Sequence, residues 1–257
     1  MTTHFVGDTL TLTGRSLRHI LRSPDTIITT AIMPIAFMLL FVFVLGGAID
    51  TGTGPGEGSY VNYLLPGILL ITIASGIAYV AYRLFLDLQR GIFERFQSMP
   101  IARSAVLWAH VLTSIVANLI SVVLVVGVAL ILGFRSGAGP LAWLAVAGIV
   151  TLFTLALTWI AVIPGLTAKT VDGASAFSYP LIFLPFLSSA FVPTASMPGP
   201  VRWFAENQPV TSIVNSIRAL LTQQPVGIEL PIALAWCVGI LAVAVAVATV
   251  IHRRRIG

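Results

Sequence analysis

The residues of this chain that could carry chemistry gather in one short segment, residues 83–100, which is both charged and amphipathic. On a helical wheel its charged face holds Arg83, Asp87, Arg90 and Glu94 at i, i+4, i+7 and i+11, and neighbouring charges of opposite sign at these spacings favour a helix. The opposite face is apolar and consists of Phe85, Leu88, Ile92, Phe96 and Met99. An aromatic anchor surrounded by charges is a common composition for a docking surface. The segment therefore predicts a soluble partner, although a solvated helix that merely joins two membrane spans is an alternative reading.

Catalytic and metal-binding patterns do not occur in the sequence. The only lysine, in Gly165-Leu-Thr-Ala-Lys-Thr170, lacks the spacing of a phosphate-binding loop, and there is no H-E-x-x-H, G-x-S-x-G or Cys/His cluster. His110 is isolated from the other three histidines, and we expect it to be a packed or interfacial residue rather than a proton relay. The sequence thus predicts neither an enzyme nor a cofactor site.

The composition identifies the class of protein. The 257 residues are 57% hydrophobic and only 9% charged, whereas soluble domains carry about 25% charged residues. Six stretches are long and apolar enough to cross about 30 Å of hydrocarbon as helices, and none shows the alternation of a barrel strand. We therefore predict an all-α polytopic membrane protein, a single domain over 1–257, with transmembrane helices at 26–49, 61–82, 104–132, 141–164, 173–193 and 230–251.

Three further elements are expected around these spans. Residues 8–22 form an amphipathic helix along the membrane surface, with Arg15, Arg18 and Arg22 on one side. Residues 83–99 form the charged helix between the second and third spans. Residues 194–229 are too polar to span yet carry apolar residues at helical spacing, which predicts a re-entrant or interfacial hairpin on the outer face. The fifth span contains several prolines, so its outer end cannot be one straight helix.

The positive charges predict the orientation. With both termini in the cytoplasm, 11 of the 14 basic residues lie in inside segments and only Arg135, Arg202 and Arg218 lie outside. This asymmetry follows the positive-inside rule for an even number of spans. It also argues against nucleic acid as the reason for the net charge of +5.

Two motifs resemble those of a known family. The string Asp87-Leu-Gln-Arg-Gly-Ile-Phe-Glu-Arg-Phe-Gln-Ser-Met-Pro-Ile-Ala-Arg-Ser104 resembles the cytoplasmic motif of the daunorubicin-resistance-type permeases in the ABC-2 transporter superfamily. Asn207-Gln-Pro-Val-Thr211 with Arg218-Ala-Leu-Leu221 is similar to their outer segment before the last helix. The order of the elements agrees over nearly the whole chain. One departure is Gln89, where relatives often carry an acid.

The resemblance implies a role for each of these elements. Residues 83–99 would be a coupling helix seated in a cleft of a separate ATPase subunit, and 8–22 a connecting helix that contacts the same ATPase. ATP and Mg²⁺ would be bound by that partner, not by this chain. Two permease chains, identical or paralogous, would combine with two ATPases in a bacterial cytoplasmic membrane. The implied coupling residues are Arg83, Asp87, Arg90, Glu94, Arg95, Phe96, Met99 and Arg103.

The cargo is constrained only by the composition of the spans. No predicted span contains Asp or Glu, which disfavours a proton- or sodium-driven carrier, although a secondary transporter and an accessory membrane subunit stay open as alternatives. We expect most polar residues within the spans to form interhelical hydrogen bonds. Walls of apolar and small polar groups suit an apolar or amphiphilic cargo such as a drug, an antibiotic or a lipid. The candidate pathway residues are Thr72, Ser75, Tyr79, Phe177, Phe183 and Ser188.

Overall fold

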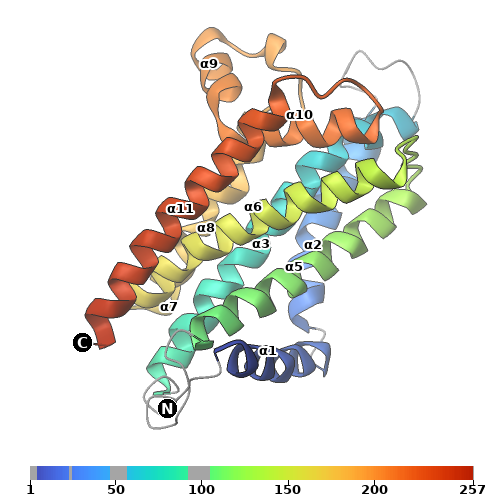
Figure 1. The fold of residues 1–257 in the computed structure, drawn as a ribbon. Coiled ribbons are helices and arrows are strands. Elements are labelled where there is room, and N and C mark those ends of the chain that lie inside the picture. Colours follow the sequence, from blue (N-terminus) through green and yellow to red (C-terminus); the bar gives the residue numbers. More distant parts are fainter. Residues whose placement is uncertain (1–4, 23–24, 47–56, 92–104, 257) are drawn as a thin grey trace.

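The chain folds into an elongated bundle of helices (Figure 1). The computed structural model describes residues 5–22, 25–46, 57–91 and 105–256, and every regular element in those ranges is helical. The longer helices are α1 (Phe5–Arg22), α2 (Asp25–Leu40), α3 (Glu57–Gln89), α5 (Ala105–Ile131), α6 (Pro140–Thr167) and α11 (Glu229–Ile256). The shorter ones are α7 (Val171–Ala176), α8 (Ser178–Phe183), α9 (Gly199–Asn207), α10 (Pro209–Leu221), the π-helix η1 (Phe41–Leu45) and the 3₁₀ helices η2 (Leu184–Leu187) and η3 (Thr194–Ser196).

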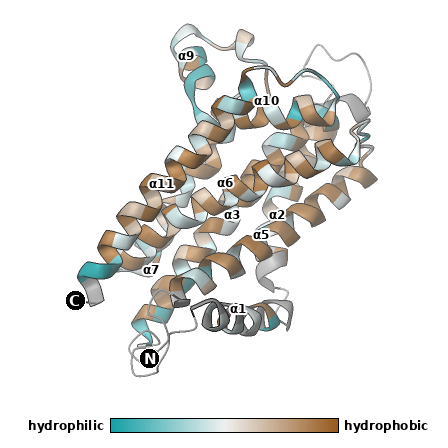
Figure 2. Ribbon diagram, viewed as in Figure 1, coloured by the Kyte–Doolittle hydropathy of each residue, from teal (hydrophilic) through white to brown (hydrophobic). Residues whose placement is uncertain are grey.

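The two ends of the bundle carry different elements. At one end, here called the α1 end, α1 lies across the bundle and packs against α5, near the end of α3 (Figure 1). At the other, the α10 end, α10 packs against α3, α6 and α11, with α9 beyond it. The shafts between the ends are mostly apolar, and hydrophilic residues are concentrated around α9 and α10 and at the end of α11 (Figure 2).

Helix α3 is the centre of the bundle. It packs against α2, α5, α6, α7, α8 and α10, and 83% of its most apolar window is buried, against 17% for α11. Such packing requires small residues at the points of closest approach. A Cβ atom on Gly67 would lie 2.6 Å from the Cβ atom of Ala190, and one on Gly76 would lie 2.0 Å from Oδ1 of Asn118. These two glycines therefore allow the turn after η2 and α5 to approach α3.

Four of the predicted spans are long, apolar helices. They cover Tyr60–Gln89, Leu107–Ile131, Pro140–Thr167 and Glu229–Arg254. The other two are shorter apolar segments, Thr30–Leu45 and Val171–Leu187. The second of these is divided into α7, α8 and η2, as its prolines predict, because Pro180 and Pro185 each remove a backbone donor.

The boundary between the second span and the charged segment differs from the prediction. We expected the span to end at residue 82 and a separate helix to begin at 83, but α3 continues without a break to Gln89. No proline or glycine interrupts residues 77–90, so both halves propagate one helix. Gly91, with a φ of 65°, then ends it in the left-handed conformation. Residues 92–104, and with them the rest of the predicted coupling helix, lie outside the described part of the chain.

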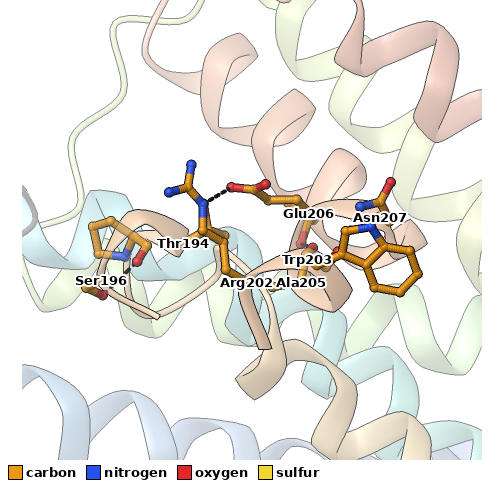
Figure 3. Close-up of polar contacts among 9 residues, drawn as sticks. Thr194, Ser196, Arg202, Trp203, Ala205, Glu206 and Asn207 are labelled. Carbon is orange, nitrogen blue, oxygen red and sulfur yellow. Dashed lines mark hydrogen bonds and ion pairs between the residues drawn. The ribbon is translucent and has the colours of Figure 1, made fainter. Parts of the chain in front are cut away.

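Residues 194–229 form two short helices with different surroundings. In α10, Ile213, Val214 and Ile217 are fully buried, in agreement with their helical spacing in the sequence. In α9, Trp203 and Phe204 are exposed, and its polar contacts lie on the surface (Figure 3). There Nε of Arg202 lies 2.7 Å from Oε1 of Glu206, a contact that holds the pKa of Glu206 below its ordinary value.

Arg218 fastens α10 to the centre of the bundle. Its guanidinium carbon lies 3.9 Å from the centroid of the Tyr63 ring, and its Nη2 donates to the carbonyls of Ser189 at 2.8 Å and Tyr63 at 3.1 Å. Nη1 donates to Oδ1 of Asn215 at 3.1 Å. The Tyr63 hydroxyl in turn donates to the Ser189 carbonyl. One half-buried cation therefore joins α3, α10 and the turn after η2, whereas the sequence indicated only an outer positive charge.

The close approach of α3 and α5 can be tested at Gly76. The Gly76→Ala substitution should destabilise the protein by about 1–3 kcal/mol, because the new methyl group overlaps Asn118. Thermal unfolding in detergent measures the loss. Gly127→Ala on α5 is the matched control, since a Cβ atom there meets nothing within 4 Å. The penalty should shrink in an Asn118→Ala background, and an undiminished penalty would contradict the contact.

The role of Arg218 can be tested by the Arg218→Gln substitution. Shortening the side chain leaves the carbonyl oxygens of Tyr63 and Ser189 without their donor, so the loss should be about 2 kcal/mol. Faster proteolysis within residues 194–229 and a lower unfolding temperature are the expected readouts. Arg202→Gln breaks only an exposed ion pair and should leave both unchanged. Equal effects of the two substitutions would contradict a special role for Arg218.

Candidate functional site

The predicted coupling residues begin on the last turns of α3. Arg83 is half-buried, Asp87 is partly exposed and Arg90 is exposed just beyond the end of the helix. This is the end of the bundle at which α1 and the beginning of α5 lie (Figure 1). The remaining predicted coupling residues, Glu94, Arg95, Phe96, Met99 and Arg103, lie outside the described residues. The described part of the charged segment is thus continuous with the central helix of the bundle.

Asp87 makes a contact that the helical wheel did not predict. Its Oδ2 lies 3.1 Å from Nε2 of His110 at the beginning of α5. The expected pairing with Arg83 one turn earlier does not occur, because the Asp87 carboxylate reaches across to α5. Arg83 instead has its guanidinium carbon 5.9 Å from the centroid of the Tyr79 ring, which is within cation–π distance. The ends of α3 and α5 are therefore joined by a polar contact at the α1 end.

Helix α1 covers this end of the bundle. It packs against α5, with Thr9 and Thr13 buried and Leu12 against the apolar cluster formed by α3, α5, α6 and α11. Arg18 is exposed, and Arg15 and Arg22 belong to the same helix. The amphipathic helix predicted for 8–22 is present from Phe5 to Arg22 and presents one face to α5.

A polar groove lies between α3 and α5, and it is named here the α3–α5 groove. Its α3 wall consists of Gly76, Tyr79, Val80 and Arg83. Its α5 wall consists of His110, Thr113, Ser114, Ala117, Asn118 and Ser121. Ser16 of α1 and Thr30 of α2 complete the lining. Both long walls belong to helices apolar enough to cross a membrane, so this concentration of polar groups is unusual for its surroundings.

The hydroxyl groups of the groove are bonded within their own helix. Thr113 donates to the carbonyl of Ala109 at 2.6 Å, Ser114 to that of His110 at 2.7 Å, and Ser121 to that of Ala117 at 3.2 Å. Thr72 on α3 does the same toward Ile68. The expectation of interhelical hydrogen bonds is therefore wrong for Thr72, Thr113 and Ser121, because the i−4 carbonyl is within reach of a helical Ser or Thr. Their oxygens keep lone pairs that can accept a further hydrogen bond.

The six candidate pathway residues do not gather at one place. Tyr79 lines the α3–α5 groove. Thr72 and Ser188 are buried, and the hydroxyl of Ser188 donates to the carbonyl of Pro185. The Ser75 hydroxyl is buried with no hydrogen-bond partner among the described residues. Between α7 and α8, Phe177 is half-buried. At the end of α8, Phe183 is exposed, and the centroid of its ring lies 6.2 Å from that of the Phe186 ring.

A signal for the groove exists in the sequence, although it was not used. His110, Thr113, Ser114, Asn118 and Ser121 follow each other at i, i+3, i+4, i+8 and i+11 along an otherwise apolar span. This spacing places them on one face of a helix. Considered one at a time, each is an ordinary polar residue in a span. Considered together, they predict a polar face.

Comparisons with known proteins agree with this architecture. The family model described as ABC-2 type transporter matches residues 8–222. A daunorubicin resistance ABC transporter permease protein of Streptomyces coeruleorubidus is 27% identical over 220 residues, which cover 84% of this chain and 75% of the relative. A probable doxorubicin resistance ABC transporter permease protein of Mycobacterium tuberculosis is 27% identical over 253 residues, covering 97% of this chain and 90% of the relative.

The match includes α1, the central helix α3, both walls of the α3–α5 groove and α10. The matched range therefore contains both motifs, residues 87–104 and 207–221, on which the resemblance to the family was based. Members of this family are membrane subunits of transporters and not catalytic domains. With a family model matched over 8–222 and two permease relatives covering most of its length, this chain belongs to the ABC-2 type transporter family.

Proposed function

We propose that this chain is the permease subunit of an ATP-driven exporter, and that it moves an apolar or amphiphilic cargo outward across a bacterial cytoplasmic membrane. The observation that carries the proposal is the family match over 8–222, together with relatives that are named as drug resistance permeases. The apolar composition of the four long helices supports a multi-pass membrane subunit.

The proposed topology has six spans and both termini in the cytoplasm. The four long helices supply four spans, and the α2–η1 and α7–α8–η2 segments supply two shorter ones. The α1 end would then face the cytoplasm, where Arg18, Arg90, Arg253 and Arg254 are exposed, in keeping with the positive-inside rule. The α10 end would face outward, with α9 and α10 as an interfacial hairpin.

The proposed energy source is a separate ABC ATPase, two copies of which would bind two permease chains. Docking would involve residues 83–103, centred on Glu94, Arg95 and Phe96, and α1 would contact the same ATPase. The continuity of α3 supports this mechanism, because a force applied just beyond Gly91 acts on a helix that reaches the α10 end. The contact of Asp87 with His110 would carry part of the same movement to α5.

The proposed cargo follows from the residues that the bundle exposes. Large apolar side chains on α5, α8 and α11 are exposed on the single chain, among them Val123, Phe183 and Val243. The predicted spans contain no Asp or Glu, and apart from His110 their polar side chains are hydroxyls and amides. Such surfaces suit a drug, an antibiotic or a lipid and have no charge to hold a small ion.

The docking role can be tested with the Glu94→Ala and Phe96→Ala double substitution. Removing the aromatic anchor and the central charge should reduce binding of the ATPase subunit at least tenfold and abolish cargo-stimulated ATP hydrolysis, since anchors of this kind dominate interfaces. Pull-down and hydrolysis assays in reconstituted membranes measure both. The matched control removes the same residue types at the opposite end, Phe204→Ala with Glu206→Ala. Normal cargo-stimulated ATP hydrolysis in the Glu94 and Phe96 variant would contradict the docking proposal.

The orientation can be tested with single cysteines. The chain has one cysteine, Cys237, which is buried, and Cys237→Ala gives a background without thiols. In intact cells, a membrane-impermeant maleimide should label Gln224→Cys and not Arg254→Cys, both of which replace exposed residues at opposite ends. Both should react after the cells are opened. Labelling of Arg254→Cys in intact cells would reverse the proposed orientation.

A further inference from the structure

The α5 wall of the α3–α5 groove has polar groups, Thr113, Ser114, Asn118 and Ser121, that the proposed function does not use. It lies between two apolar helices, and its cavity volume is about 30 Å³, room for about two water-sized groups. Among the described residues, Arg83 has no carboxylate partner: Asp87 pairs with His110, and Arg83 contacts the ring of Tyr79. Within the part of the chain that the structure describes, the groove therefore carries a cation without a bound carboxylate.

Three hydroxyl groups on the α5 wall of the groove are hydrogen-bond acceptors toward a ligand. The hydroxyls of Thr113, Ser114 and Ser121 use their protons on carbonyls of α5, so their lone pairs are what they offer a ligand. Asn118 is 3% exposed, and its amide oxygen, pressed against Gly76, has no hydrogen-bond partner among the described residues. A ligand that fits would bring hydroxyl or N–H donors.

The charge of the groove favours a hydroxyl donor on the ligand over an ammonium donor. An ammonium group taken out of water requires a carboxylate nearby, and no Asp or Glu is among the lining residues. A hydroxyl group has no such requirement. The matching ligand thus carries an anion close to Arg83 and a neutral hydroxyl arm small enough for the cavity.

From these observations we infer that the α3–α5 groove binds the head of an anionic phospholipid of the phosphoglycerol type. The phosphate lies at Arg83, where it forms a charge-assisted hydrogen bond with the guanidinium. The terminal hydroxymethyl arm enters the cavity beside Thr113 and Ser114. The acyl chains stay in the bilayer, because both walls belong to membrane-spanning helices. The site shares Arg83 with the segment proposed to dock the ATPase, whereas its other lining residues lie outside residues 83–103. Binding of the lipid does not depend on export.

Lipid binding to the purified full chain tests this inference without the ATPase. Native mass spectrometry of the chain in mixed micelles measures bound phosphatidylglycerol against phosphatidylcholine and phosphatidylethanolamine of the same acyl composition. Phosphatidylglycerol should be preferred over phosphatidylcholine by about tenfold. All three lipids offer a phosphate to Arg83, but only phosphatidylglycerol adds a neutral hydroxyl arm, whereas the other two bring an ammonium group next to an arginine. Equal binding of the two lipids, or a preference for phosphatidylethanolamine, would overturn the inference.

Two variants with matched controls assign the preference to the groove. Arg83→Gln should abolish it, whereas Arg253→Gln, which removes an exposed cation at the same end of the bundle, should leave it intact. Thr113→Val with Ser114→Ala should lower it severalfold, whereas Thr249→Val should not, although Thr249 also bonds its own helix, at Val245. If the Arg83 variant keeps the preference, the inference is wrong.

Soluble glycerol phosphate distinguishes a lipid from a free phosphate ester. Glycerol phosphate and phosphatidylglycerol share the phosphoglycerol group. If glycerol phosphate displaced phosphatidylglycerol at comparable concentrations, the groove would bind the soluble ester, and the lipid assignment would be wrong. No displacement is expected. Because no hydrolysis or transport is measured, a failure here leaves the exporter proposal standing, and a failure of docking at Glu94 and Phe96 leaves the lipid site standing.

Discussion

The burial of most of α3 is the constraint on which the rest of the structure depends. Helices in a bilayer gain little from hiding apolar surface from one another, so close packing and polar contacts hold them together. Gly67 and Gly76 let neighbouring segments reach the backbone of α3, and Gly165 of α6 leaves room for the side chain of Leu84. The positions of α2, α5, α6, α8 and α10 all follow from contact with this one helix.

The same helix connects the two ends of the molecule. Its 33 residues extend about 50 Å at 1.5 Å per residue. Arg218 holds it through Tyr63 near one end, and His110 holds it through Asp87 near the other. Both ends of α3 are therefore held by polar contacts to other helices.

Composition and periodicity were sufficient for the class of protein, four long apolar helices and the buried face of α10, and the resemblance of two motifs indicated the family. They could not give the contacts between helices, because these depend on the rotation and register of each helix in the bundle. Arg218 counted only as an outer charge, and Asp87 was paired along its own helix instead of with His110. The hydroxyls were expected to bridge helices. Ser189 does so, toward Asn215 of α10, but Thr72, Thr113 and Ser121 bond to the carbonyl four residues earlier. The break of the fifth span was predictable, since proline acts locally.

The partners of Arg218 determine how the contacts at the α10 end of the bundle depend on pH. They are backbone carbonyls, an amide oxygen and an aromatic ring, none of which gains or loses a proton between about pH 4 and pH 9. The ion pair of Glu206 in α9 behaves differently: it is present at neutral pH and is lost as the pH falls through the lowered pKa of that carboxyl. Acidification therefore releases the surface contact of α9 first, while α10 stays fastened to the bundle.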